Sequence, residues 1–280
     1  MSLKATSSIR RLAIILGDQL DDQSAVLDDF DPAQDAVWMA EAEEESQHVW
    51  SHQARIVMFL AAMRHLRDRL RERGITVHYH AMDDSDETRT LSGLLTEAVR
   101  KLKPRELIVV EPGEYRVEQS LRGAANNLQT PLTVLPDRHF LCSDEQFADH
   151  ADGRKQLRLE YFYREMRKRL GVLVDDDGKP VGGDWNYDQK NRETFGKDGP
   201  TDVPPRRGFE PDAVTREVID LVSDRFADHP GRCDRFDWPV TPEDAEAALD
   251  RFIEQRLPNF GKYQDAMWTD EPWLYHAHLS

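Results

Sequence analysis

Residues 12–20 read LAIILGDQL, and this stretch decides the fold class. It opens with five consecutive apolar residues, which are typical of a strand buried on both faces of a parallel sheet. The run stops at Gly17, and Asp18 and Gln19 follow at once. Polar residues at the end of such a strand lie at the carboxyl edge of the sheet, where open parallel sheets bind ligands. The stretch therefore predicts a sheet and one side of a binding site.

The same pattern repeats along the first 140 residues. Short apolar runs alternate with amphipathic stretches, and the longest of these has apolar residues at three- and four-residue intervals before it ends at Gly74. This alternation predicts an α/β fold with a doubly wound parallel sheet covered by helices on both faces. The expected strands are 12–16, 36–40, 75–82, 107–110 and 132–135, and the expected helices include 56–70 and 91–102.

Beyond residue 140 the pattern changes. Residues 144–170 are predicted to be helical with an interruption at Gly153, and 171–211 form an irregular stretch rich in Pro, Gly and Asp. Helices are predicted again at 215–226 and 242–257, the second opened by the capping sequence TPED at 241–244. We therefore expect an α/β domain over 1–140, a helix and interdomain loop over 141–213, and the start of a helical domain over 214–280.

Composition limits the class of protein. Of 280 residues, 39% are apolar and 32% charged, no apolar run approaches the ~18 residues of a membrane span, and the first residues lack a signal-peptide core. The two cysteines, Cys142 and Cys233, are too few for a four-thiolate cluster and show no CxxC spacing. These features predict a soluble, monomeric protein of a reducing cytoplasm, without a membrane partner.

Charge is unevenly distributed. A net charge of −16 argues against non-specific binding of polyanions by the whole surface. Residues 154–169, however, hold seven Lys or Arg against two Glu. This segment is either a local basic face for a polyanion or an ordinary solvated helix face.

Residues 182–192, GGDWNYDQKNR, have neither strand alternation nor helical apolar spacing, so a loop is predicted. Flat rings beside amide and carboxylate groups suit a surface that stacks on a planar polar partner such as a base or a flavin. The alternative is a loop that folds back and buries its own rings. Composition leaves both interpretations open.

The predicted strand ends are acidic. There is no GxGxxG and no GxxxxGK[ST], so the usual phosphate cradles are missing. Carboxylates at Asp18, Glu41 and 111–114 suit a polyhydroxylated or heteroaromatic ligand, unless they only cap the helices that follow. His48 and His52 are four apart, as helix-borne metal ligands are, but no third ligand is evident. We predict no metal site.

Several longer motifs resemble one family. They are LGDQL at 16–20, HVWSH at 48–52, AMRH at 62–65, EPGEYR at 111–116, EYFYREMR at 160–167, the loop at 182–192 and QDAM at 264–267. In this order they resemble the deoxyribodipyrimidine photolyase-related proteins, that is, the iron–sulfur bacterial cryptochromes and (6-4) photolyases. The resemblance covers nearly the whole chain.

The resemblance implies an N-terminal antenna domain holding a lumazine-type chromophore, 6,7-dimethyl-8-ribityllumazine, and a helical domain binding FAD and a [4Fe-4S] cluster. Light-driven electron transfer from reduced FAD would repair a (6-4) lesion flipped out of damaged DNA. It places Asp18, Gln19, Glu41, His52 and Phe59 at the antenna, and Tyr263, His276 and Ser280 at the flavin phosphates. Asp188 and Asp265 would face the lesion as catalytic residues, and Arg154, Arg158, Trp185, Asn186 and Arg192 would contact DNA.

The chain also departs from the family. Family members are longer, and their cluster cysteines lie in a part that this sequence lacks; neither cysteine here matches one of them. We expect the chain by itself to hold at most the antenna and to be inactive, whether it is a fragment or a truncated homologue. A photosensory cryptochrome without repair activity and a stand-alone chromophore-binding α/β module are the alternatives. The loop at 182–192 is expected to lie over the flavin and lesion cleft.

Overall fold

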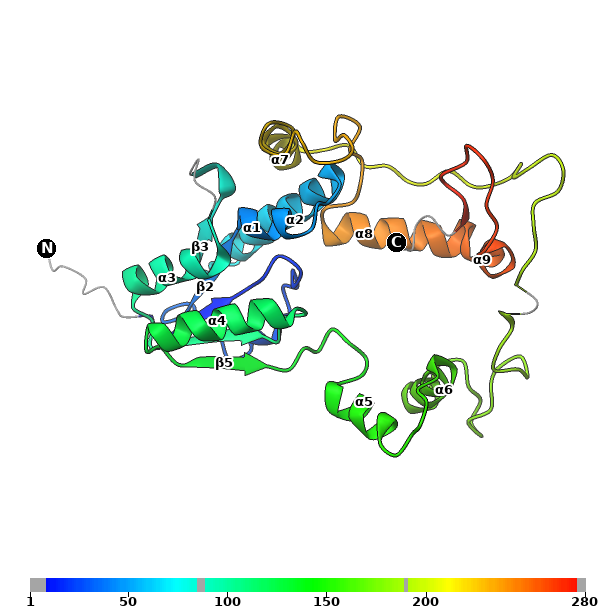
Figure 1. Cartoon of the computed structure of the whole chain (residues 1–280), viewed down its shortest axis with the longest axis horizontal. Helices are drawn as coiled ribbons and strands as arrows, with labels where there is room; N and C mark the ends of the chain where they lie inside the picture. The colour runs from blue at the N-terminus through cyan, green and yellow to red at the C-terminus, as the bar shows by residue number, and fades with distance from the viewer. Residues whose placement is uncertain (1–8, 85–88, 189–190, 276–280) are drawn as a thin grey trace, which may run out of the picture. The chain divides into compact units, whose positions relative to one another are not determined.

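The computed structural model describes residues 9–84, 89–188 and 191–275, and Figure 1 labels its helices and strands. The chain divides into two compact units. The first contains the described residues up to His139 together with Phe209–Asp244. The second contains Phe140–Gly208 and the described residues from Ala245 onward.

A five-stranded parallel sheet forms the centre of the first unit. The strand order is β3-β2-β1-β4-β5, and all four neighbouring pairs are parallel. The predicted α/β fold with a parallel sheet is confirmed. The outer strand β3 is shorter than predicted, because the chain turns into a short 3-10 helix at Met82. The strands are β1 (Arg11–Ile14), β2 (Ala36–Ala40), β3 (Val77–His80), β4 (Glu106–Val110) and β5 (Leu132–Leu135).

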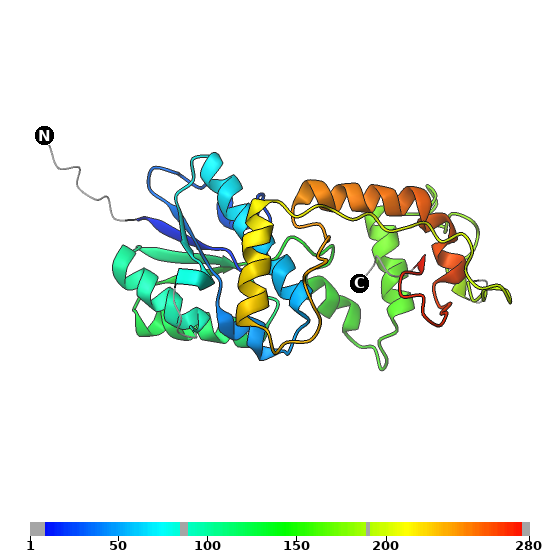
Figure 2. The same cartoon turned by 90° about the horizontal axis from the view of Figure 1, so that it is seen from above.

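One face of the sheet packs against α2 (Gln53–Glu72). The side chain of His52 caps α2 by accepting a hydrogen bond from Ala54 N at 3.0 Å. Helix α7 (Ala213–Arg225) then covers the outer side of α2, as both views show (Figures 1 and 2). This face therefore has two helical layers, and the second comes from far along the sequence.

The opposite face packs against α3 (Leu91–Leu102) and α4 (Tyr115–Asn127). Trp38 of β2 is fully buried there, among leucines of β1 and of the two helices. Because β1 is covered on both faces, its side chains are apolar without alternation, which is why residues 12–16 indicate a central strand. The short elements of this unit are η1 (Ala25–Leu27), α1 (Glu43–His48) and η2 (Met82–Asp84).

The second unit is helical. Its elements are α5 (Asp144–Ala151), α6 (Leu159–Leu170), the greater part of α8 (Pro242–Gln255) and α9 (Leu257–Tyr263). The predicted break at Gly153 is confirmed, since α5 and α6 are separate and Gly153 has a φ of 68°. Buried His150 joins the two helices through a 2.6 Å contact between its Nδ1 and Glu165 Oε2.

The described residues of 171–211 form no α-helix and contain an isolated bridge between Val174 and Pro180, so the predicted irregular stretch is confirmed. Arg256, 2% exposed, lies between α8 and α9 and donates hydrogen bonds to Leu274 O, at 2.7 Å, and Pro204 O. The predicted helix over 242–257 is confirmed as α8, and a second helix, α9, follows it. Pro258 lies in the first turn of α9, where proline begins a helix rather than continuing one.

No helix in the described part of the chain combines the length and the apolarity needed to cross a membrane.

Candidate functional site

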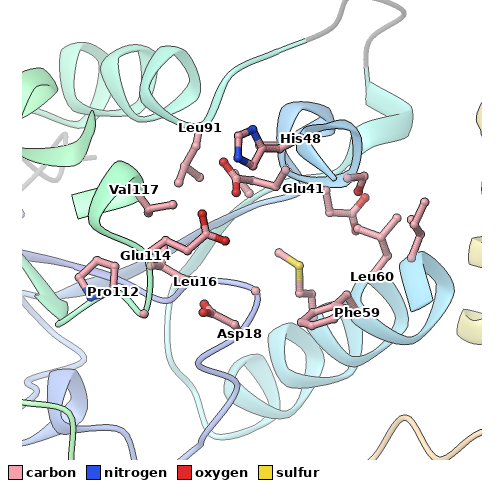
Figure 3. A pocket seen from close by; sticks show the side chains of 18 of the residues that line it. Leu16, Asp18, Glu41, His48, Phe59, Leu60, Leu91, Pro112, Glu114 and Val117 are labelled. Carbon is pink, nitrogen blue, oxygen red and sulfur yellow. The ribbon is translucent and has the colours of Figure 1, made fainter. Parts of the chain in front are cut away.

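A pocket of about 240 Å³ opens at the carboxyl edge of the sheet. It is lined by residues that follow β1, β2 and β4, and by one side of α2 (Figure 3). The strands on either side of β1 are reached by connections that run in opposite directions, so the pocket lies at the topological switch point, where open parallel sheets bind ligands. All of its lining belongs to the first unit.

One wall of the pocket is apolar. Phe59, Leu60 and Met63 of α2 form it, and Leu91 and Val117 lie across from them (Figure 3). The flat face of Phe59 suits stacking against an aromatic ring of a ligand. This wall can therefore hold the apolar part of a heteroaromatic molecule.

Glu41, predicted to contact a ligand, lines the pocket but is held by protein groups. Its two oxygens accept hydrogen bonds from Arg64 Nε at 2.7 Å, Arg64 Nη2 at 3.0 Å, Tyr79 Oη at 2.6 Å and Met82 N at 2.8 Å. Burial is the main cause that raises the pKa of Tyr79, and the nearby Glu41 carboxylate raises it further. The phenol therefore stays protonated and donates its hydrogen bond to Glu41. With four donors on two oxygens, Glu41 shapes the pocket wall.

Asp18 is the lining carboxyl group with no ion pair in the described part of the chain. Limited hydration at the pocket mouth raises the pKa of Asp18, and the nearby charges of Glu114 and Glu45 raise it further. Gly113 lies beside it, since a Cβ there would stand 3.6 Å from Asp18 Oδ2. Asp18 is thus available to accept hydrogen bonds from a ligand (Figure 3).

A charge cluster that was not predicted from the sequence borders the same pocket. Arg116 Nη1 and Nη2 donate to Glu45 Oε1 and Oε2 at 3.0 and 2.7 Å, and Nη2 also donates to Glu114 Oε2 at 3.0 Å. Glu45 follows β2, whereas Arg116 follows β4. The available signal was that each residue follows a strand next to β1. Their pairing, however, spans 71 residues of sequence.

Two predicted antenna residues, Gln19 and His52, are not among the pocket's lining residues. Gln19 Nε2 donates to Glu111 O at 2.8 Å, while its Oε1 is buried without a hydrogen-bond partner among the described residues. The His52 ring lies against Gly231, where a Cβ would stand only 1.8 Å from Nε2. His48 ends α1 and His52 caps α2, so the two do not share a helix turn.

In the second unit, the loop at 182–192 packs its tryptophan against α6. The Trp185 ring lies 5.0 Å from Arg167, 5.4 Å from Lys168 and 5.7 Å from Arg164. The hydroxyl of Tyr187 accepts a hydrogen bond from Asp184 N at 3.3 Å. Both rings are half-buried, so the loop packs its own aromatics in part, and Asn186 is left exposed.

Two of the seven cations of the basic segment 154–169 form ion pairs in the described part of the chain. Arg154 contacts Glu165 at 2.7 Å, and Arg164 pairs with Glu160. Arg158, just before α6, is exposed and has no ion pair in the described ranges, and Arg192 is exposed as well. Both glutamates belong to the same segment, so its excess of positive charge is the one that the sequence indicates.

The segments that carry Asp188 and Asp265 lie next to each other. A Cβ on Gly261 would stand 3.4 Å from Asn191 Nδ2, and Lys262 Nζ contacts Glu193 Oε2 at 3.2 Å. Both aspartates are exposed.

Tyr263 lies in a stack of three rings, 4.9 Å from Phe195 and 5.6 Å from Tyr275 between centroids. The predicted phosphate residues His276 and Ser280 lie outside the described residues.

The two cysteines belong to different units. Cys233 is buried with its Sγ 3.2 Å from Ser223 Oγ, and Cys142 is half-buried in the second unit. Within the described ranges, no three His, Cys, Asp or Glu side chains gather as metal ligands would.

Known proteins resemble this chain over most of its length. Residues 13–238 match the family described as deoxyribodipyrimidine photo-lyase-related protein. A (6-4) photolyase of Agrobacterium fabrum is 41% identical over 270 residues, which cover 96% of this chain and 53% of that protein. An uncharacterized protein of Acanthamoeba polyphaga mimivirus is 25% identical over 146 residues, which cover 50% of this chain and 71% of that protein.

The chain thus spans about half the length of the Agrobacterium relative. The family match covers well over half of the chain, and the identity to this relative holds along nearly all of it. The chain belongs to the deoxyribodipyrimidine photo-lyase-related protein family.

Proposed function

We propose that the pocket binds a lumazine-type antenna, 6,7-dimethyl-8-ribityllumazine, and that the whole protein uses light to repair (6-4) lesions in damaged DNA. The observation that carries the proposal is the pocket itself. It lies at the switch point of a parallel sheet, in a chain 41% identical to a (6-4) photolyase, and combines an apolar wall with a free carboxyl group.

The lining residues fit such a chromophore. The ring system would lie against Phe59 and Met63, and the hydroxyl groups of the ribityl chain would donate hydrogen bonds to Asp18. Glu41, whose oxygens already accept hydrogen bonds from protein groups, would hold Arg64 in place and form part of the pocket wall. Gln19 and His52 would support the pocket without contacting the ligand: Gln19 holds the chain after β4, and His52 caps the start of α2.

Binding of the flavin, the cluster and DNA would fall to the second unit and to the part of the protein that corresponds to the unmatched half of the Agrobacterium relative. FAD and a [4Fe-4S] cluster would be held mainly outside this chain, and reduced FAD would supply the electron that starts repair. Within the chain, Tyr263 would face the flavin phosphates and Asp188 and Asp265 the lesion. DNA would be contacted by Arg154, Arg158, Trp185, Asn186 and Arg192. The proposed domains are 1–140 for the antenna, 141–213 for the helix and loop, and 214–280 for the flavin-domain start.

Purified protein is expected to bind added 6,7-dimethyl-8-ribityllumazine saturably in a fluorescence titration. Phe59→Ala should weaken the affinity about tenfold, because the ring loses its stacking surface. Phe140→Ala, which removes an exposed ring from the second unit, is the matched control and should leave the affinity unchanged. No saturable binding, or equal effects of the two substitutions, would contradict the proposed antenna site.

Repair is tested on the whole protein loaded with its cofactors. Under blue light, (6-4) product in an oligonucleotide should disappear with time, and in the dark it should persist, because repair needs a photoexcited electron donor. Chromatography of the digested DNA measures the loss. A loaded protein that absorbs blue light yet leaves the lesion intact would instead be a photosensory cryptochrome.

A further inference from the structure

Two of the three arginines at the pocket are already paired with carboxylates. Arg64 is held by Glu41, and Arg116 is held by both Glu45 and Glu114. Arg55 lies over the Phe59 ring at 5.6 Å and has no ion pair within the described ranges, while Asp18 is the lining carboxyl group that is likewise unpaired. The pocket region therefore contains four carboxylates (Asp18, Glu41, Glu45 and Glu114) and three arginines, so it has no excess of positive charge.

The helix that begins at this pocket is also an unfavourable anion site, because carboxylates surround its N-terminus. In most doubly wound folds a ligand phosphate binds at a helix N-terminus beside the switch point, where free N–H groups and the helix dipole attract it. Here α4 begins beside the pocket, and Glu114 occupies its N-cap position. Glu45 and Asp18 add negative charge next to it. The Glu114 side chain makes no cap hydrogen bond in the described part of the chain, but the three carboxylates at this end of α4 oppose the approach of a phosphate.

We infer that the pocket selects ligands with an uncharged ribityl chain against the 5′-phosphates of the same ligands, and that Glu45 and Glu114 impose this choice by withholding Arg116. The inference rests on the proposed function, since it concerns the same site, and it names the chemical class of ligand that the site accepts. A phosphate dianion at the start of α4 would meet carboxylates at short range, and Arg116, the guanidinium at that end, is already paired. The unpaired Arg55 lies on α2, over the Phe59 ring. A neutral polyol keeps its hydrogen bonds to Asp18 without this repulsion.

The test compares 6,7-dimethyl-8-ribityllumazine with its 5′-phosphate ester in fluorescence titrations of the same protein. The unphosphorylated compound is expected to bind at least about tenfold more tightly. Raising the salt concentration to about 0.5 M should narrow the ratio, because ions screen the repulsion. In the double variant Glu45→Gln with Glu114→Gln, the ratio should fall to about threefold or less, because Arg116 becomes free to pair with the phosphate.

A matched double variant controls for overall charge. Glu97→Gln with Glu106→Gln removes two carboxylates that pair with Arg89 and Arg11 and do not line the pocket, and it changes the net charge equally. Its ratio should equal that of the wild type. Circular dichroism checks the fold of each variant, and Glu114→Gln alone, at a side chain 58% exposed, serves if the double variant does not fold.

The outcomes separate the inference from the proposed function. Equal affinities for the two compounds, tighter binding of the ester, or a ratio unchanged when Glu45 and Glu114 are replaced would overturn the inference and leave the antenna site standing. If neither compound binds, the proposed function fails and the inference fails with it.

Discussion

Replacing Arg64 by methionine is expected to lower the free energy of unfolding by about 3–5 kcal/mol, the range seen when one member of a buried ion pair is removed. The Arg64 side chain is 4% exposed and that of Glu41 is 0% exposed. Methionine fills much of the same space but leaves a buried carboxylate that keeps only Tyr79 and Met82 N as donors. Urea denaturation at neutral pH measures the loss.

Two further variants make this result specific. Arg71→Met removes a half-exposed arginine of the same helix, 3.8 Å from Asp68, and should cost less than about 1 kcal/mol. Adding Glu41→Gln to Arg64→Met should restore part of the stability, because the buried group is then neutral. A loss from Arg64→Met no larger than that from Arg71→Met would show that the pair is not a buried support of the pocket.

Phe226→Ala should also lower the free energy of unfolding by about 3–5 kcal/mol, as expected for an aromatic side chain removed from a close-packed core. Phe226 is 1% exposed and follows Val218 and Val222, both 0% exposed, on the side of α7 that covers α2. Its carbonyl also accepts a hydrogen bond from Gln53 Nε2 at 3.2 Å, at the start of α2. Thermal and urea unfolding both measure the effect.

The comparison is with Ile253→Ala, which removes a 47% exposed side chain from α8 and should change stability by about 1 kcal/mol or less. A loss from Phe226→Ala that matches this control would mean that α7 lies only loosely on the sheet domain. That result would also mean that residues Phe209–Asp244 do not unfold together with the rest of the first unit.

Local patterns predicted the elements of the sheet domain well. Residues 36–40, 91–102 and 132–135 form β2, α3 and β5 with the predicted bounds, because turn residues and a capping threonine at Thr90 mark their ends. The helix predicted over 242–257 forms as α8, but the break at Arg256 and the helix after it were not predicted. Long-range hydrogen bonds from Arg256 to Pro204 O and Leu274 O hold this break. Contacts of that kind leave no local signal in a sequence.

The candidate pocket was predicted in part. Asp18, Glu41 and Phe59 line it as expected, because the carboxyl ends of parallel strands meet at one edge. What each carboxylate does could not be predicted, since Glu41 is committed to Arg64 and Glu45 to Arg116, partners 23 and 71 residues away. Likewise, the apolar side of α7 indicates burial but does not identify α2 as the surface it covers.

The return of Phe209–Asp244 to the sheet domain has a consequence for how the protein is made. A domain interrupted by an insertion cannot finish folding as its first segment leaves the ribosome, because part of its core has not yet been synthesised. After β5 emerges, the outer side of α2 stays uncovered while the whole intervening stretch Phe140–Gly208 is translated. The apolar face of α2 is therefore exposed on the nascent chain during this time. We expect a chaperone to bind that face at this stage of synthesis.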